Sequence, residues 1–518
     1  MRAAYGVETV RTAERELMAR LPEGALMQRA AAGLAAVCAG LLGRVYGARV
    51  VLLVGSGDNG GDALYAGARL ARRGAGVTAV LLDAERAHGG GLAALRRAGG
   101  AVAGGAGGAG GAGGAGGAGG VGAGVVLAGA DLVIDGITGI GGRGGLREAA
   151  VPLARAARDS GAIVVAVDLP SGVEADSGEV RGECVRADAT VTFGTYKPGL
   201  LIDPAREYVG AVRLVELGLD LGAAEADVEA LQHADVAALL PVPGAESDKY
   251  RRGVVGVVAG SERYPGAAVL AVAGALRGGA GAVRYVGHGA DAVIARYPEA
   301  LVHAGPPSKA GRVQAWVVGP GLGEDADRAL GDVLASDVPV LVDADGLRPL
   351  EPEMVRGRDA PTLLTPHAGE AAALLGVSRE EVEAGRLVAV RELAALYGAT
   401  VLLKGSTTLV APAGGAGAGF VRRPVRVNPT GTPWLATAGS GDVLSGLAGA
   451  LLAAGLGAVD AGSVAAYVHG LAGRLAAGGA GVGAAPVGAH DVADAVPGAW
   501  RGVVGRGRAA PGAPFGTA

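Results

Sequence analysis

Two stretches of the chain alternate short apolar runs with amphipathic segments, which is the pattern of α/β domains. In the first stretch, residues 8–43 have helical spacing of apolar positions, interrupted by Pro-Glu-Gly at 22–24. Residues 48–55 (ARVVLLVG) form a continuous aliphatic run, which predicts a buried parallel strand. An amphipathic helix over 62–74 and a strand over 77–83 complete a βαβ unit.

The alternation continues to about residue 218 and then begins again. The first stretch predicts a helix near 146–160 and further strands within 130–136, 162–172, 189–194 and 212–218. The second stretch predicts helices over 267–280 and within 437–475, and strands within 253–261, 315–321, 339–346, 362–367 and 400–405. The sequence therefore predicts two α/β domains, over residues 1–222 and 230–503.

Three segments do not fit this alternation. Residues 103–124 are a Gly-Gly-Ala tract without proline, which we interpret as a flexible surface insertion with no chemistry. Residues 223–229 lie in a polar, alanine-rich stretch that predicts a linker. The Gly-, Pro- and Arg-rich residues 504–518 predict a flexible tail.

Composition excludes several classes of function. The net charge of −4 and the aromatic content of 3% are not those of a nucleic-acid binder. The two cysteines, Cys38 and Cys184, are too few for a disulfide scaffold or a structural zinc site, and they fit a reducing compartment. The first 25 residues lack the apolar core of a secretory signal, and the uncharged stretch 443–459 is short for a membrane span. We expect a cytoplasmic protein without nucleic-acid or membrane partners.

Glycine and lysine carry different weight in this chain. Because the chain has 97 glycines, glycine motifs occur often by chance, and a single motif is weak evidence. The lysines are scarce and each is informative: Lys197, Lys249, Lys309 and Lys404.

A first group of candidate residues follows the strands of the N-terminal domain. Residues 55–60 match G-x-G-x-x-G between a strand and a helix, and Asp83 ends the next strand, as in dinucleotide-binding folds. Asp58 and Asp62, which we expect in this loop, would repel phosphate unless a cation intervened. The loop therefore more plausibly holds a cation, or the sugar and ring end of a nucleotide.

Two further loops carry acidic residues. Asp135 is followed by the glycine-rich residues 136–145, which can form an anion nest, and Asp168 is followed by Leu-Pro-Ser-Gly. Because ligands bind at the carboxyl ends of strands in open α/β sheets, we expect the three acidic loops to converge. The alternative is that these aspartates are helix caps or turn residues.

A second group lies in the C-terminal domain. Residues 437–442 (TAGSGD) open an apolar helix, where backbone N–H groups and the helix dipole favour a phosphate. Asp442 could take the proton of an attacking hydroxyl there, as in the ribokinase-like kinases that this pattern resembles, or could simply cap the helix. Lys404 ends a strand and suggests a nucleotide contact, whereas His367 is either structural or a ligand contact.

The motifs V-G-x-G-D-N-G-G-D, V-D-G-I-x-G-I-G-G and V-D-L-P-S-G resemble the N-terminal domain of the bifunctional NAD(P)H-hydrate repair enzymes. The motifs Y-P-G-A-A, V-G-P-G-L-G, D-A-D-G-L, T-P-H-x-G-E, L-K-G and A-G-S-G-D resemble their C-terminal domain. The resemblance implies a Rossmann-like NAD(P)H-hydrate epimerase followed by a ribokinase-like, ADP-dependent (S)-NAD(P)H-hydrate dehydratase. Such an enzyme converts ADP into AMP and phosphate while it regenerates NADH or NADPH.

The resemblance also implies the sites of the N-terminal domain. Asp168 would be the catalytic acid or base. A potassium ion would bind to Asn59, Asp135 and Ser171. The hydrate would contact Asp58, Asn59, Gly60, Gly61, Asp62, Gly139, Ile140, Gly141, Gly142, Arg143, Gly144, Gly145 and Asp168.

For the C-terminal domain, the resemblance implies that Asp442 is catalytic and that magnesium accompanies ADP. The hydrate would contact Ala267, Gly321, His367 and Asp442. The adenine nucleotide would contact Lys404, Gly405, Ser406, Thr407, Thr408 and Gly441. We further expect a homo-oligomer. The chain departs from the family pattern at Asp58, Ala63, Thr432 and Trp434.

Two alternatives stay open at this point. One is a ribokinase-like kinase of a small hydroxylated metabolite, in which the product keeps its phosphate. The other is an N-terminal domain that binds ligand without catalysis, which the departures at Asp58 and Ala63 would allow.

Overall fold

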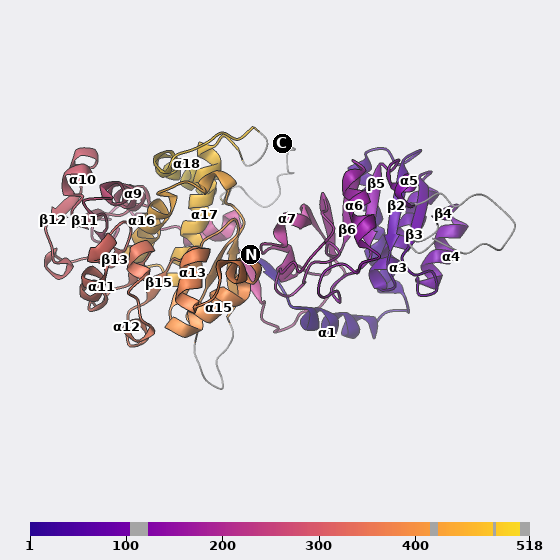
Figure 1. Ribbon diagram of the computed structural model, residues 1–518, viewed down its shortest axis with the longest axis horizontal. Coiled ribbons are helices and arrows are strands. Elements are labelled where there is room, and N and C mark those ends of the chain that lie inside the picture. The colour runs from indigo at the N-terminus through magenta and orange to yellow at the C-terminus, as the bar shows by residue number, and fades with distance from the viewer. Residues whose placement is uncertain (104–122, 415–422, 480–482, 508–518) are drawn as a thin grey trace. The chain divides into compact units, whose positions relative to one another are not determined.

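The chain forms two compact units, Ala3–Asp227 and Val228–Ala518, the latter together with Met1–Arg2. The structure is a computed structural model, and it describes residues 1–103, 123–414, 423–479 and 483–507 (Figure 1). Both units are α/β, as the alternation of apolar runs predicted, and this fold class is confirmed.

The N-terminal unit is built on a parallel sheet of seven strands in the order β4-β3-β2-β5-β6-β7-β8. The strands are β2 (Arg49–Val54), β3 (Gly76–Leu81), β4 (Ala101–Ala103), β5 (Leu132–Gly136), β6 (Ile163–Val167), β7 (Ala189–Phe193) and β8 (Ala211–Val215). The order reverses between β2 and β5, which makes their carboxyl ends a topological switch point. Ligands of doubly wound sheets bind at that point, so the fold itself positions a site there.

Helices cover both faces of this sheet. The helices are α1 (Val7–Met18), α2 (Ala25–Leu42), α3 (Asp58–Arg72), α4 (Gly89–Arg97), α5 (Ala123–Leu127), α6 (Val151–Asp159) and α7 (Arg206–Val209). Residues of α2, α3 and α4 share one apolar core with the strands, and residues of α5 and α6 share the core on the other face. Helix α2 is long and apolar enough to cross a membrane, but its buried side, with Leu34 and Cys38, belongs to the first of these cores.

The C-terminal unit has a sheet in the order β1-β9-β18-β17-β16-β15-β14-β13-β10-β11-β12. These strands are β1 (Arg2–Ala4), β9 (Val228–Ala230), β10 (Val254–Val258), β11 (Ala282–Val286), β12 (Leu301–His303), β13 (Ala315–Val318), β14 (Val340–Val342), β15 (Thr362–Leu364), β16 (Thr400–Leu403), β17 (Thr408–Ala411) and β18 (Val425–Asn428). From β16 to β12 every neighbouring pair is parallel, whereas β17 is antiparallel to both of its neighbours. The carboxyl ends of β13 to β16 therefore lie side by side.

The longer helices of this unit are α8 (His233–Leu239), α9 (Pro265–Arg277), α10 (Ala290–Arg296), α11 (Ala326–Leu334), α13 (Ala368–Leu375), α15 (Arg386–Tyr397), α16 (Ser440–Ala453), α17 (Ala458–Ala476) and α18 (Ala489–Gly507). Helices α9, α16, α17 and α18 share one apolar core with the sheet (Figure 1). Helix α16 is packed so closely on α9 that a Cβ at Gly446 would lie 1.9 Å from the carbonyl oxygen of Ala271. The small residues of α16 therefore let this helix lie close against α9.

Several expected boundaries are wrong. Helix α3 begins at Asp58, so residues 58–62 form its first turns and are not in a loop. The cause is Gly57, whose extended backbone already serves as the N-cap. Residues 228 and 229, expected in the linker, belong to β9, because the polar stretch ends in a Val-Glu-Ala segment that pairs with β18.

The ends of two expected flexible segments are also ordered. Helix α18 runs to Gly507, into the tail expected at 504–518, and the remaining residues 508–518 lie outside the described residues. Of the tract 103–124, the first residue belongs to β4 and the last two to α5. Residues 104–122 lie outside the described residues.

Candidate functional site

A cavity of about 1570 Å³ lies at the switch point of the N-terminal sheet. Its wall contains most of the residues expected to contact the hydrate, namely Asp58, Asn59, Asp62, Gly139, Ile140, Gly141, Gly142, Arg143, Gly145 and Asp168. Gly60, Gly61 and Gly144 are not among the lining residues. Gly60 instead permits a close approach, because a Cβ there would lie 2.3 Å from the carbonyl oxygen of Gly55.

Asp168 enters this cavity as one member of a buried ion pair. It directly follows β6 and has a φ of 66°, a left-handed conformation that is uncommon outside glycine. Its Oδ1 accepts from Lys197 Nζ at 2.5 Å and from Thr192 Oγ1 at 2.9 Å. Lys197 is 1% exposed and also donates to the carbonyl oxygen of Phe193 at 2.9 Å. A fully buried lysine side chain therefore holds the Asp168 carboxylate in place.

Other carboxyl groups gather near Asp168. Burial raises the pKa of Asp62 well above its usual value, and the charges of Asp168, Asp58 and Glu14 raise it further. Burial likewise raises the pKa of Glu14 on α1, although Lys197 opposes this. Asp62 Oδ1 is buried and has no hydrogen-bond partner among the described residues. Burial at this wall of the cavity therefore favours the neutral forms of Asp62 and Glu14 more than water does.

The three residues expected at a potassium ion lie close together, and one of them, Asn59, also lines the cavity. Asp135 is fully buried and accepts from Ser171 N at 2.8 Å and from Ser171 Oγ at 2.7 Å. Burial raises the pKa of Asp135 to about 6 against these hydrogen bonds. Ser171 Oγ accepts from Thr138 N, and Asn59 Nδ2 donates to the carbonyl oxygens of Thr138 and Val167. Carboxylate, hydroxyl, amide and carbonyl oxygens are the ligands that hard cations take, so the donor set fits.

In the C-terminal unit, Asp442 lies in the first turn of α16, after Gly439 in a left-handed conformation. The N–H groups of that turn have no partner within the helix and can face an anion. Burial raises the pKa of Asp442 to about 7, and the charge of Asp343 adds to this while Lys404 opposes it. A carboxyl with such a pKa is matched to proton transfer near neutral pH.

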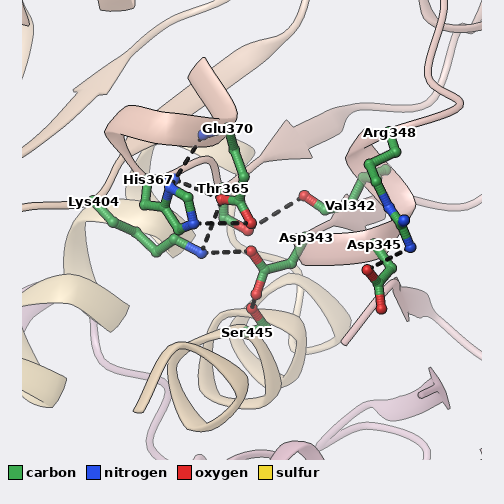
Figure 2. Close-up of polar contacts among 9 residues, drawn as sticks. All are labelled: Val342, Asp343, Asp345, Arg348, Thr365, His367, Glu370, Lys404 and Ser445. Atoms are coloured by element: carbon green, nitrogen blue, oxygen red, sulfur yellow. Dashed lines mark hydrogen bonds and ion pairs between the residues drawn. The ribbon is translucent and has the colours of Figure 1, made fainter. Parts of the chain in front are cut away.

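A polar cluster joins the strand ends to this helix (Figure 2). Asp343, which follows β14, accepts from Lys404 Nζ at 2.6 Å and from Ser445 Oγ at 2.6 Å. Lys404, which follows β16, also lies 3.6 Å from Glu370 Oε2. Burial lowers the pKa of Lys404, but Asp343 and Glu370 outweigh it, so the net shift is upward and the side chain is a cation.

The other expected residues of this site are placed around the cluster. His367 caps α13, with Nδ1 accepting from Glu370 N, so the structural interpretation holds whether or not the ring also contacts a ligand. Gly321 adjoins Ala267 so closely that a Cβ would lie 2.6 Å from the Ala267 methyl. Gly441 lies beside the lysine, since a Cβ there would be 3.6 Å from Lys404 Nζ.

Comparisons with known proteins match both units in the same order. The family described as YjeF-related protein N-terminus matches residues 23–199, and the family described as NAD(P)H-hydrate dehydratase matches residues 255–497. The bifunctional NAD(P)H-hydrate repair enzyme Nnr of Mycobacterium leprae is 49% identical over 94% of this chain and 97% of its own length. The chain belongs to the bifunctional NAD(P)H-hydrate repair enzymes.

A distant member of this family, the enzyme of the same name from Thermofilum pendens, is 35% identical over 88% of each chain. Among solved structures, the ADP/ATP-dependent NAD(P)H-hydrate dehydratase of Bacillus subtilis is 30% identical, with a TM-score of 0.47. The match covers 52% of this chain and 97% of the Bacillus chain.

The departures from the family pattern have different structural settings. Ala63 is fully buried, and its methyl group fits because residue 136 is a glycine, where a Cβ would lie only 2.7 Å from it. Thr432 is buried, and its Oγ1 has no hydrogen-bond partner among the described residues. Trp434 is 39% exposed. Nothing in the structure explains the tryptophan.

Sequence reasoning missed four side chains that shape these sites. Lys197 and Asp343 are the buried partners of predicted residues, and Glu14 approaches Asp168 from α1. Arg386 of α15 donates to the carbonyl oxygens of Lys404 and Thr407 and so supports the expected nucleotide-contact loop. The scarcity of lysine was a usable signal for Lys197, whereas Glu14 and Arg386 gave none.

Proposed function

We propose that this chain repairs hydrated NADH and NADPH. Water adds across the C5–C6 bond of the reduced nicotinamide ring and gives two epimeric hydrates that can no longer donate a hydride. The N-terminal domain interconverts the R and S forms, and the C-terminal domain dehydrates the S form at the expense of ADP. The observation that supports this proposal is that two separate units match the two families in order, and each unit has a carboxyl, Asp168 or Asp442, that we propose as its acid–base group.

In the N-terminal domain, Asp168 exchanges the proton of the hydrate hydroxyl. The carbon to be inverted bears that hydroxyl and is bonded to the ring nitrogen, so inversion needs a proton delivered to the leaving oxygen and one removed from the returning water. Lys197 keeps Asp168 in its left-handed conformation at the cavity wall. Burial raises the pKa of Asp62 and Glu14 and so favours their neutral forms at the cavity wall.

In the C-terminal domain, Asp442 accepts the proton of the hydrate hydroxyl as the hydroxyl attacks the terminal phosphoryl group of ADP. The N–H groups of the first turn of α16 and the ammonium of Lys404 stabilise the charge of that group. Phosphate is a better leaving group than hydroxide. Phosphate leaves C6 while C5 loses a proton to water, which restores the C5–C6 double bond and yields NAD(P)H, with AMP released by the phosphoryl transfer.

Two ions belong to this proposal. Asn59, Asp135 and Ser171 would hold a potassium ion, which would neutralise the buried Asp135 carboxylate and fix the loop after β5. Magnesium would enter with ADP and screen its phosphates. We also propose a cytoplasmic location, where reducing conditions keep Cys38 and Cys184 as the free thiols they are here.

The direct test is to incubate the purified protein with both hydrate epimers and ADP and to follow the absorbance of the reduced nicotinamide. Return of that absorbance supports the proposal. Accumulation of a phosphorylated product that keeps its phosphate would instead identify a kinase of a hydroxylated metabolite. Recovery limited to the S form would leave the N-terminal domain as a ligand-binding module.

A further inference from the structure

We propose that Asp343 is a positioning residue of the dehydratase site, which ties Lys404 to helix α16 and so sets the place of Asp442 and the charges around it. The inference rests on the proposed function, because it assigns Asp343 to the reaction that Asp442 performs. Asp343 is none of the residues that the family motifs assigned to the hydrate or the nucleotide.

The first argument is that both carboxylate oxygens of Asp343 are occupied. The side chain is 1% exposed, and its Oδ1 and Oδ2 accept from Lys404 Nζ and Ser445 Oγ, each at 2.6 Å. Figure 2 shows the carboxylate between these two donors, one from a strand end and one from a helix. Because the side chain is almost completely buried and each oxygen already accepts a hydrogen bond, we assign it the role of holding other groups.

The second argument is the place of these donors along α16. Ser445 follows Asp442 by three residues, which puts both side chains on the same face of the helix. Lys404 Nζ lies beside Gly441, the residue before Asp442. Asp343 is therefore bonded to α16 one turn after the proposed base, and the same carboxylate orients the ammonium of Lys404, which lies beside Gly441.

The third argument is the set of charges around Asp442. Lys404 faces it from β16, Asp343 and Asp345 from the segment after β14, and Glu370 from α13. His469 on α17 is neutral near pH 7, because burial lowers its pKa to about 4. After burial itself, Asp343 is the largest influence that raises the pKa of Asp442. Removing this one charge should make Asp442 a weaker base.

The test compares the pH dependence of dehydration in Asp343→Asn with that of the natural chain, at saturating ADP and S hydrate. We expect the acidic midpoint of kcat to fall by about one pH unit, since a like charge near Asp442 has been removed. Asp345→Asn is the matched control, because it removes the same charge two residues away and should move the midpoint less. Ser445→Ala keeps the charge, so it should lower kcat without moving the midpoint.

An unmoved midpoint in a folded Asp343→Asn variant would overturn the proposal, as would an equal shift in Asp345→Asn. If Asp343→Asn does not fold, Lys404→Gln can be compared with the double variant Lys404→Gln/Asp343→Asn, which leaves neither partner of the pair as an unpaired charge. The double variant must then have the lower midpoint, and equal midpoints would contradict the proposal.

A readout without turnover separates this inference from the proposed function. In protein labelled with ¹³C at the aspartate carboxyls, the Asp442 signal is identified by its loss in Asp442→Asn. Its titration midpoint should fall in Asp343→Asn. A moved midpoint in a protein that dehydrates no hydrate would sustain the role of Asp343 and refute the proposed function. An unmoved midpoint in an active enzyme would do the reverse.

Discussion

Each unit of the chain places a lysine–aspartate pair at the carboxyl ends of parallel strands, but the two pairs have different roles. In the N-terminal unit, Lys197 holds Asp168 at 2.5 Å, and that carboxylate itself lines the cavity. In the C-terminal unit, Lys404 holds Asp343 at 2.6 Å, and the proposed base is a neighbouring carboxyl, Asp442. A lysine–aspartate pair can thus present a reactive carboxylate directly, or it can change the electrostatic field around a neighbouring carboxyl.

The comparison fails if one carboxylate serves both reactions, and Asp442→Asn tests this with the largest expected effect. Asparagine keeps the shape and can still cap α16, but it cannot accept the hydroxyl proton. We expect kcat of dehydration to fall by about 10²–10⁴-fold, with little change in ADP affinity. Steady-state rates on pure S hydrate give this number. Asp460→Asn, a matched change in the first turn of α17, should leave the rate unchanged, and a near-normal rate in Asp442→Asn would return it to a helix cap.

The reciprocal variant is Asp168→Asn. It should lower epimerisation by about 10²–10⁴-fold while pure S hydrate is still repaired at the normal rate. Chiral separation of the hydrates without ADP measures the first rate, and recovery of reduced nicotinamide measures the second. Asp159→Asn on the exposed side of α6 is the control. Loss of both activities in Asp168→Asn would show that the two sites do not work separately.

Replacing each lysine should show that the two pairs contribute differently to the free energy of unfolding. Lys197→Met leaves Asp168 as a buried, uncompensated charge, so we expect a loss of about 3–5 kcal/mol of unfolding free energy. Lys404→Met should cost less, because the 18% exposure of Lys404 lets water reach the vacated position beside Asp343, whereas Lys197 is 1% exposed. Denaturant unfolding at fixed pH provides both values. Equal losses would mean that burial does not distinguish the two pairs.

The pH dependence sharpens the comparison for the C-terminal pair. Asp442 must be ionised to accept a proton, and its pKa is raised to about 7 by burial and by Asp343. The rate of dehydration should therefore rise with pH through about 7 and fall about tenfold per pH unit below it. Rates on S hydrate from pH 5 to about 9 would show this, and a flat profile across that range would exclude Asp442 as the base.

The smallest effect is expected for deletion of residues 104–120 from the glycine-rich tract. Loop length changes the entropy of closure only logarithmically, so both activities should stay within about twofold of the natural chain. The two assays used for Asp168→Asn measure this. Loss of epimerisation alone would make the tract part of the N-terminal site.

The fold class could be predicted from the sequence because an apolar run such as 49–54 indicates a buried strand, whichever elements pack on it. The sequence also predicted the reactive loops, since parallel strands bring their carboxyl ends to one edge. It did not predict the pairs. Lys197 lies 29 residues from Asp168, and only the register of β6 against β7 brings them together. Asp343 and Ser445 are 102 residues apart, so no local pattern could join them.

Local misjudgements had local causes. Asp-Asn-Gly-Gly is typical of loops and therefore predicts a later start for α3, whereas the extended Gly57 caps a helix that begins at Asp58. The glycine and proline content of residues 504–518 predicts a flexible tail, but Val504 packs against the C-terminal core and lies within α18.

The central claim is that one chain carries two independent acid–base carboxyls for two successive steps. The most direct measurement is the recovery of reduced nicotinamide from mixed hydrate epimers with ADP, compared among the natural chain, Asp168→Asn and Asp442→Asn. The account predicts full recovery in the first, recovery that stops when the S form is exhausted in the second, and none in the third. Mixing the purified Asp442→Asn protein with the purified Asp168→Asn protein should restore full recovery. Failure of this mixture to exceed Asp168→Asn alone would contradict the account.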